Sequence, residues 1–271
     1  MSTTAHNEEL ASRAFSRQSP VFDNLYSGNI IIQYKRQRVR DHVARFLEPG
    51  SDILELNSGT GEDAAWFAAQ GHRVHATDIS IGMQEILEQK IAAASLQEQV
   101  STELISFTSL GQLQRKKEYD LIFSNFAGLN CTDQLGNVLQ SFHPLLKPGG
   151  VVTLVLLPKC CLWELLLVFR GRFKTAFRRW FVPKGASAQV EGVAFRCWYY
   201  NPSFVTRQLR ENYEILGIEG LCTLVPPSYM ENFPRKYPNL FAWLKKKEAR
   251  YKSKWPWRSV GDYYIISFRK K

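Results

Sequence analysis

Apolar and polar positions follow one another along this chain in the order expected of an α/β protein. The apolar run Ile53–Leu56 and the stretch Arg73–Thr77, in which apolar residues alternate with polar ones, have the length of strands. Longer amphipathic stretches, including Ile30–Leu47 and Asp133–Leu146, predict helices. This alternation of strands and helices predicts a sheet of mostly parallel strands. The other predicted strands are Val100–Ile105, Tyr119–Phe126, Val151–Leu157, Tyr213–Leu224 and Gly261–Phe268.

One stretch combines a strand, a glycine turn, a helix and a second strand that ends on an acid. Gly59 and Gly61 lack a Cβ, so the backbone can turn tightly and approach a ligand. Glu55 precedes the turn and would repel a pyrophosphate, whereas it suits a cationic ligand. Asp78 ends the second strand, where an acid can accept hydrogen bonds from a ribose diol. S-adenosylmethionine, with its ammonium, sulfonium and ribose, fits this pattern better than a dinucleotide.

The pattern E-x-N-x-G-x-G followed by an acid resembles motif I and its sequel in class I S-adenosylmethionine-dependent methyltransferases. That family usually has glycine at the place of Asn57, but asparagine enters left-handed conformations more readily than other non-glycine residues. The Lys147–Gly150 turn before an apolar strand is another frequent family feature. The resemblance covers nearly all of residues 50–157 and, more loosely, 201–271. It implies a Rossmann-like, seven-stranded, mostly parallel sheet with an antiparallel last strand.

The resemblance also implies S-adenosyl-L-methionine as cofactor, S-adenosyl-L-homocysteine as product, and no metal. In the family, the strand end at Ser106 usually carries an acid that edges the adenine ring, and this sequence has none there. Relatives also fold an upstream aromatic across the cofactor, which points to Tyr26, with Tyr34 and Arg36 as further candidates. The predicted cofactor-binding residues are Glu55, Asn57, Ser58, Gly59, Thr60, Gly61, Asp78, Ile79, Met83, Ser106, Phe107, Thr108, Ser124, Asn125, Phe126 and Tyr26.

The catalytic residues remain unknown from the sequence. Methyl transfer from a sulfonium is an in-line displacement, so alignment of the reactants is the main requirement. Asn125 can orient an acceptor but is not a strong base. We interpret His72 and His75, which flank a core strand, as structural histidines, and we expect His143, late in its helix, to lie away from the site. There is no Asp-Asp-Asn metal constellation, so a catechol-type magnesium site is not indicated.

The domain organisation predicted from the sequence has two parts. Residues 1–19 are polar and predict a flexible lead, whereas residues 20–271 predict the methyltransferase domain. Within that domain, residues 158–200 depart from the minimal fold and predict an insert that caps the acceptor site. The N-terminus lacks the apolar core of a signal peptide, and Val151–Phe169 is interrupted by polar residues, so we expect a cytoplasmic protein. The five cysteines show no C-x-x-C spacing, which predicts reduced thiols.

The net charge of +10 is concentrated in clusters around 170–184 and 245–258. Such clusters suit nucleic acid, an anionic substrate or an anionic membrane, and are also common on solvated surfaces. The leading hypothesis is a methyltransferase for a small molecule, such as an aromatic or lipid-like natural product, with the aromatic insert setting specificity. The alternatives are an RNA or protein methyltransferase and a non-catalytic binding subunit. The oligomeric state does not follow from the sequence.

Overall fold

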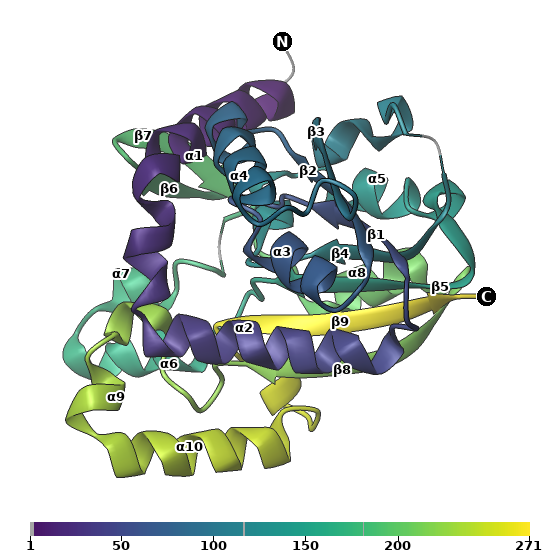
Figure 1. The fold of residues 1–271 in the computed structure, drawn as a ribbon. Coiled ribbons are helices and arrows are strands. Elements are labelled where there is room, and N and C mark those ends of the chain that lie inside the picture. Colours follow the sequence, from purple (N-terminus) through teal and green to yellow (C-terminus); the bar gives the residue numbers. More distant parts are fainter. Residues whose placement is uncertain (1–2, 116, 181) are drawn as a thin grey trace.

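The computed structural model describes residues 3–115, 117–180 and 182–271. Its core is a seven-stranded sheet in the order β3-β2-β1-β4-β5-β9-β8 (Figure 1). The pairs among β1 to β5 are parallel, and β9 runs antiparallel to both β5 and β8. The predicted fold class, including the antiparallel last strand, is therefore confirmed. The strands are β1 Asp52–Leu56, β2 Arg73–Asp78, β3 Val100–Leu104, β4 Tyr119–Ser124, β5 Leu146–Leu156, β8 Tyr213–Leu221 and β9 Tyr263–Lys270.

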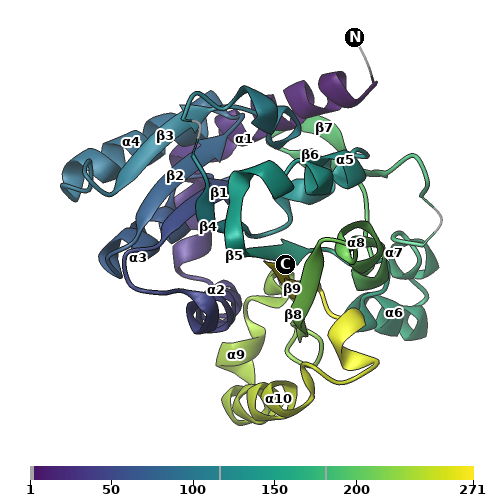
Figure 2. The ribbon, with the colours of Figure 1, turned by 90° about the vertical axis from the view of Figure 1, so that its right-hand side faces the viewer.

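Helices cover both faces of the sheet (Figure 2). Strand β1 shows why: Ile53 packs on one face, while Leu54 and Leu56 pack on the other. Helices α2 (Ile30–Val43), α3 (Glu62–Ala69) and α4 (Ile81–Ala93) cover the first face, and α5 (Leu135–Gln140) and α8 (Pro202–Leu209) cover the second.

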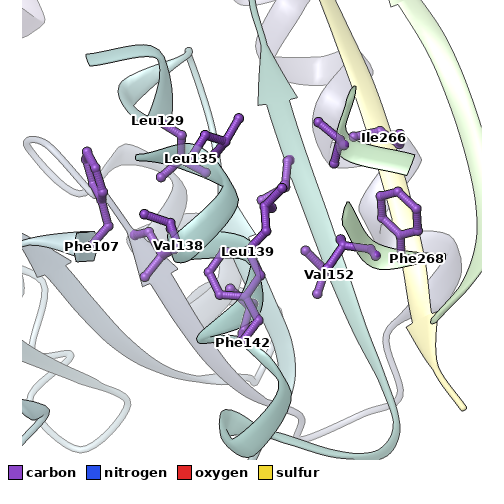
Figure 3. Close-up of a cluster of buried hydrophobic side chains, with 14 of the residues drawn as sticks. Phe107, Leu129, Leu135, Val138, Leu139, Phe142, Val152, Ile266 and Phe268 are labelled. Carbon is purple, nitrogen blue, oxygen red and sulfur yellow. The ribbon is translucent and has the colours of Figure 1, made fainter. Parts of the chain in front are cut away.

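The second face holds the larger apolar cluster. Leu135, Val138 and Leu139 of α5 pack against Val152 of β5 and against neighbouring strands (Figure 3). These side chains are almost completely buried, and each contributes about 1.5–3 kcal/mol relative to an exposed position. The cluster packs α5 against the sheet and so stabilises the strands whose ends carry the site.

The N-terminal segment is a long helix, α1 (Thr3–Ser27), and the prediction of a flexible lead is wrong for residues 3–19. Ala11 and Ala14 are buried against a small hairpin. Gly82 of α4 lets α1 approach closely, since a Cβ there would lie 2.9 Å from the Ser16 carbonyl oxygen. The prediction rested on the polar composition of this segment, and composition does not report contacts with residues far away in the sequence. Residues 1 and 2 lie outside the described residues.

The predicted insert consists of short elements. The apolar residues 160–169 form α6 (Leu162–Leu165) and a 3-10 turn (Leu166–Arg170), which ends at Gly171 in a left-handed conformation with φ 69°. Helix α7 (Phe173–Ala176) follows, and β6 (Ala186–Val190) then pairs with β7 (Val193–Cys197). This hairpin packs on α1. Residue 181 of the insert lies outside the described residues.

The segment before the last strand carries α9 (Phe233–Lys236) and α10 (Pro238–Tyr251). Further 3-10 turns span Ala44–Phe46, Phe107–Gln112, Gly128–Cys131, His143–Leu145, Ser228–Met230 and Trp257–Ser259. Within residues 3–115, 117–180 and 182–271, none of the helices combines the length and apolar character needed to cross a membrane.

Candidate active site

A cavity lies at the carboxyl ends of β1, β2, β3 and β4. The strand order reverses between β1 and β4, and ligands of open α/β sheets bind at such a switch point. Helix α1 closes the cavity from above with Glu8, Ala11, Ser12, Phe15 and Phe22. Among the described residues of 158–200, none lines this cavity, so the capping role of the insert stays a prediction.

Most of the predicted cofactor residues line this one cavity. Those in its wall are Glu55, Asn57, Ser58, Gly59, Thr60, Asp78, Ile79, Met83, Ser106, Phe107, Asn125 and Phe126. The other four lie behind the wall. Gly61 caps α3, Thr108 and Ser124 are held by other side chains, and Tyr26 packs edge-on against Phe22 at 4.6 Å between ring centroids. Phe15 and Phe22, rather than Tyr26, are therefore the aromatic residues that α1 presents to the cavity.

The glycine turn accommodates asparagine as the sequence suggested. Asn57 adopts a left-handed conformation with φ 48°. Its amide accepts a hydrogen bond from Ser124 Oγ (2.6 Å) and donates one to the Asn125 carbonyl oxygen (2.9 Å). A Cβ on Gly128 would overlap this side chain, so glycine at 128 makes room for asparagine at 57. The Asn57 amide thus joins the β1 turn to the end of β4.

Asp78 is fixed at the end of β2 by two backbone amides. Gly59 N donates to its Oδ2 at 2.9 Å, and Ser80 N donates to its Oδ1 at 2.8 Å. Burial raises the pKa of the Asp78 carboxyl, while these two N–H groups act in the opposite direction. Asp78 lines the cavity, and a carboxylate has about four lone-pair sites, so it can accept hydrogen bonds besides those from the backbone.

A cluster of charges surrounds Asp63 on the first turn of α3. Arg40 Nε and Asn125 Nδ2 donate to its two oxygens at 2.9 and 2.7 Å, and Arg36 lies 3.6 Å away. Asn125 Oδ1 also accepts a hydrogen bond from the Phe126 amide at 2.8 Å. Both polar ends of the Asn125 side chain are therefore engaged within the protein, which makes it a positioning residue of the cavity wall.

Glu55 is buried beside this cluster, and its Oε2 has no hydrogen-bond partner among the described residues. Burial, reinforced by the Asp63 carboxylate, raises the pKa of Glu55 well above its usual range, although Arg36 and Arg40 oppose the shift. A buried carboxylate oxygen without a partner costs roughly 1–3 kcal/mol. A cationic or hydrogen-donating ligand would remove this cost, which indicates a binding site for such a ligand.

Glu55→Gln should stabilise the ligand-free protein in a pH-dependent way. Because the folded-state pKa is raised, the contribution of Glu55 to stability is present below its unfolded pKa and is lost as pH rises through the folded value. We expect the variant to be no more stable at pH 4, and more stable by about 1 kcal/mol or more at pH 8. Urea unfolding at both pH values measures this difference. A stability difference between the variant and the wild type that does not change with pH would contradict the raised pKa of Glu55.

The backbone after β4 is strained. Phe126 and Ala127 both have positive φ, at 50° and 63°, although neither is glycine. Such conformations cost of the order of 1–3 kcal/mol each and are found mainly at functional sites. The turn places the Phe126 ring in the cavity wall, 5.2 Å beneath the Arg36 guanidinium. Arg36, only a further candidate from the sequence, is thus part of the wall.

The sequence analysis missed several residues that line the cavity. Asp63 had a signal, since it is an acid in the first turn of the helix after the glycine turn. Glu8 and Phe15 had none, because α1 reaches the cavity only through the tertiary fold. The remaining wall residues that were not among the predicted cofactor-binding residues are Ala11, Ser12, Phe22, Glu62, Ser80, Gly128 and Cys131.

Outside the cavity, the described residues contain one cluster of metal-binding types, formed by Cys161, Glu164 and Asp262. Arg179 already bridges this cluster: its Nη2 donates to Glu164 at 2.6 Å and to Asp262 at 3.0 Å. Lys35 adds a second cation, 2.8 Å from Asp262. Arg178 also pairs with Glu164, and together these cations neutralise the carboxylates, so the cluster is an ion network that connects the insert to the residue before β9.

Comparison with known proteins agrees with this geometry. Residues 53–150 match the family described as "Methyltransferase domain". The chain is 26% identical over 168 residues to malonyl-[acyl-carrier protein] O-methyltransferase of Yersinia pestis, covering 59% of this chain and 54% of that protein. The chain spans about half the length of the curated relatives it matches.

Two solved structures share the fold over nearly the whole chain. The [4+2]-cyclase SpnF superposes with a TM-score of 0.63 at 17% identity, covering 96% of this chain and 94% of that one. A 1,6-didemethyltoxoflavin-N1-methyltransferase of Burkholderia thailandensis, solved with S-adenosylhomocysteine, gives a TM-score of 0.58 at 14% identity, covering 100% and 92%. Residues 53–150 thus match the methyltransferase-domain family, and the fold is similar to that of solved S-adenosylmethionine-dependent methyltransferases.

Proposed function

We propose that this protein transfers a methyl group from S-adenosyl-L-methionine to a small molecule, of an aromatic or lipid-like class, and releases S-adenosyl-L-homocysteine. One observation carries the proposal. The cavity holds a buried, unpaired carboxylate at Glu55 and an anchored carboxylate at Asp78, each at the end of its own strand. The matched relatives, including a malonyl-[acyl-carrier protein] O-methyltransferase, support a methyltransferase with a small acceptor group.

The residues of the cavity fit this cofactor. Glu55 offers its unpaired oxygen to the ammonium group, which would relieve the cost of leaving that oxygen buried. Asp78 offers both oxygens to the ribose diol. Met83 and Phe107 supply apolar wall next to Ser106 at the end of β3, where the adenine ring would lie. Arg36 is the cation in the wall and suits the cofactor carboxylate or an anionic acceptor.

The mechanism that follows relies on position. The bound cofactor supplies an electrophilic methyl group. Phe126, held by its strained backbone, and Phe22 of α1 form an apolar wall that excludes water from the reacting atoms. The Asn57 and Asn125 side chains lock the β1 and β4 turns together, so the two halves of the site keep a fixed spacing. Neither side-chain amide can act as a base, so these two residues position the site and transfer no proton.

Methyl-labelled S-adenosylmethionine tests the proposal directly. The protein is incubated with this donor and with malonyl thioesters, small quinols, an aromatic natural-product panel, total RNA or a protein extract. We expect label only in the small-molecule fractions, accompanied by stoichiometric S-adenosylhomocysteine. Label confined to RNA or to protein would replace this proposal with the alternative of a macromolecular methyltransferase.

The surface of the insert combines exposed apolar and basic side chains, which indicate the kind of partner it would contact. Leu166, Phe169 and Phe173 are 43%, 86% and 57% exposed. Arg170, Arg172 and Lys174 are exposed between them, while the nearby acid Glu164 is buried and paired with arginines. We call the six exposed side chains the aromatic–basic surface. Exposed apolar rings with interleaved cations fit an anionic membrane, from which a lipid-like acceptor could be taken.

Binding to vesicles tests this surface. We expect the protein to sediment with phosphatidylcholine/phosphatidylglycerol vesicles, to bind pure phosphatidylcholine weakly, and to lose most binding in Phe169→Ser/Phe173→Ser, because each exposed ring contributes buried apolar area. Leu104→Ser, which alters an exposed residue of β3, is the control. Unchanged sedimentation of the double variant would refute the membrane role. Tight RNA binding that weakens steeply with salt would favour a nucleic-acid partner instead.

A further inference from the structure

Helix α1 contributes one acid, Glu8, to the wall of the cavity. Glu8 is 8% exposed and lies in the cavity wall. Its Oε2 accepts hydrogen bonds from Ser106 Oγ at 2.7 Å and from Thr108 Oγ1 at 2.9 Å. Its Oε1 is buried and has no hydrogen-bond partner among the described residues. Two hydroxyls at the end of β3 therefore hold one oxygen and leave the other free to receive a donor.

The helix that delivers Glu8 is fixed in position. Asn7, the preceding residue, donates to the Cys131 carbonyl oxygen at 2.7 Å and accepts from the Arg196 amide at 2.7 Å. One turn later, Ser12 Oγ donates to the Ile79 carbonyl oxygen at 2.9 Å. These bonds attach α1 to the strand ends on both sides of Glu8. The carboxylate is thus held at one place in the wall.

The free oxygen calls for a ligand. An unsatisfied buried carboxylate oxygen costs roughly 1–3 kcal/mol, so a site that keeps one gains when a donor arrives. The end of β3 otherwise offers Ser106, Phe107 and Thr108, with no acid of its own. Ile79 and Met83, on the loop and helix after Asp78, flank the same part of the wall. A flat heterocycle attached to a ribose at Asp78 would reach this position.

We infer that Glu8 recognises the adenine base of the cofactor by accepting a hydrogen bond from its exocyclic amino group. The inference rests on the proposed function. In this arrangement, α1 supplies the acid that the end of β3 lacks, and the Ser106 and Thr108 hydroxyls orient it. The carboxylate would reject hypoxanthine, because that base presents a carbonyl oxygen where adenine presents an amino group.

A pair of ligands tests the inference: S-adenosylhomocysteine and S-inosylhomocysteine, in which a carbonyl oxygen replaces the 6-amino group and the neighbouring N1 carries a hydrogen. Calorimetric titration of the wild type should show about 10- to 100-fold tighter binding of the adenine form, the range for a hydrogen bond to a charged group. Glu8→Gln should reduce this ratio to a few-fold, since a neutral amide can donate to the carbonyl or accept from the amine. Glu9→Gln, an exposed acid on the same helix, should keep the wild-type ratio.

The outcomes separate the inference from the proposed function. Equal affinity of the wild type for both ligands would overturn the role of Glu8 without any variant. A wild-type ratio that survives in a folded Glu8→Gln protein would overturn it as well. If that variant does not fold, Glu8→Asp provides a second test, because a carboxylate shortened by one methylene should give an intermediate ratio. No binding of S-adenosylhomocysteine to the wild type would refute the proposed function itself.

Discussion

Asp78→Ala should weaken S-adenosylhomocysteine binding by about 100-fold or more. The anchored carboxylate would accept hydrogen bonds from both ribose hydroxyls, and each bond to a charged acceptor contributes about 1.5–3 kcal/mol. Removal of the side chain also frees the Gly59 and Ser80 amides, which loosens the turn that positions Ser58 and Thr60. Isothermal titration of the wild type and the variant measures the change.

Two further variants control this experiment. Asp41→Ala removes an exposed acid of α2 and should leave the affinity unchanged. Asp78→Asn keeps an acceptor for one backbone amide, so it should fold like the wild type and still lose most of the affinity. Circular dichroism checks the fold of each variant. Full retention of binding by a folded Asp78→Ala protein would place the ribose elsewhere.

Glu248→Ala should be the most destabilising single substitution that we propose. This carboxylate of α10 is 1% exposed and accepts hydrogen bonds from four consecutive backbone amides, 222–225, at 2.8–3.1 Å. Tyr34 and Arg38 of α2 donate to it at 3.0 and 3.3 Å. Its loss would leave the four backbone N–H groups and the Tyr34 hydroxyl without this acceptor, and Arg38 would keep only Glu219 as an ion-pair partner. We expect a decrease of about 3–5 kcal/mol in the free energy of unfolding.

Chemical denaturation measures this effect. Glu248→Gln should cost less than alanine, because an amide oxygen still accepts from some of the backbone donors, although the charge opposite Arg38 is gone. Glu231→Ala, an exposed acid in the same C-terminal segment, should change the free energy of unfolding by less than about 0.5 kcal/mol. A loss of under about 1 kcal/mol in Glu248→Ala would show that water replaces the carboxylate and that this junction is open.

The sequence predicts the parts of the site whose determinants are local. The strands around Glu55 and Asp78 follow from short apolar runs, and the left-handed Asn57 follows from its place in the glycine turn. Because carboxyl ends of parallel strands meet at one edge, the clustering of twelve predicted residues in one cavity also follows once the order of strands is known.

The parts that escaped prediction depend on contacts between distant segments. Residues 3–19 are polar enough to read as a flexible lead, yet α1 is held by Asn7 and by the close approach at Gly82. Glu8 meets Ser106 across ninety-eight positions of sequence, and no local pattern marks it. The insert differs in another way: its apolar stretch is divided between α6 and a 3-10 turn, which ends at Gly171 in a left-handed conformation.

The central claim is that the cavity binds S-adenosylmethionine, and calorimetric titration of the wild-type protein tests it most directly. We expect micromolar-range binding of S-adenosylmethionine and S-adenosylhomocysteine and no measurable binding of NAD, since Glu55 at the turn disfavours a pyrophosphate. Asp78→Ala, titrated in parallel, should show weakened binding of both sulfur compounds. Binding of NAD, or no binding of either sulfur compound to the folded protein, would contradict the account.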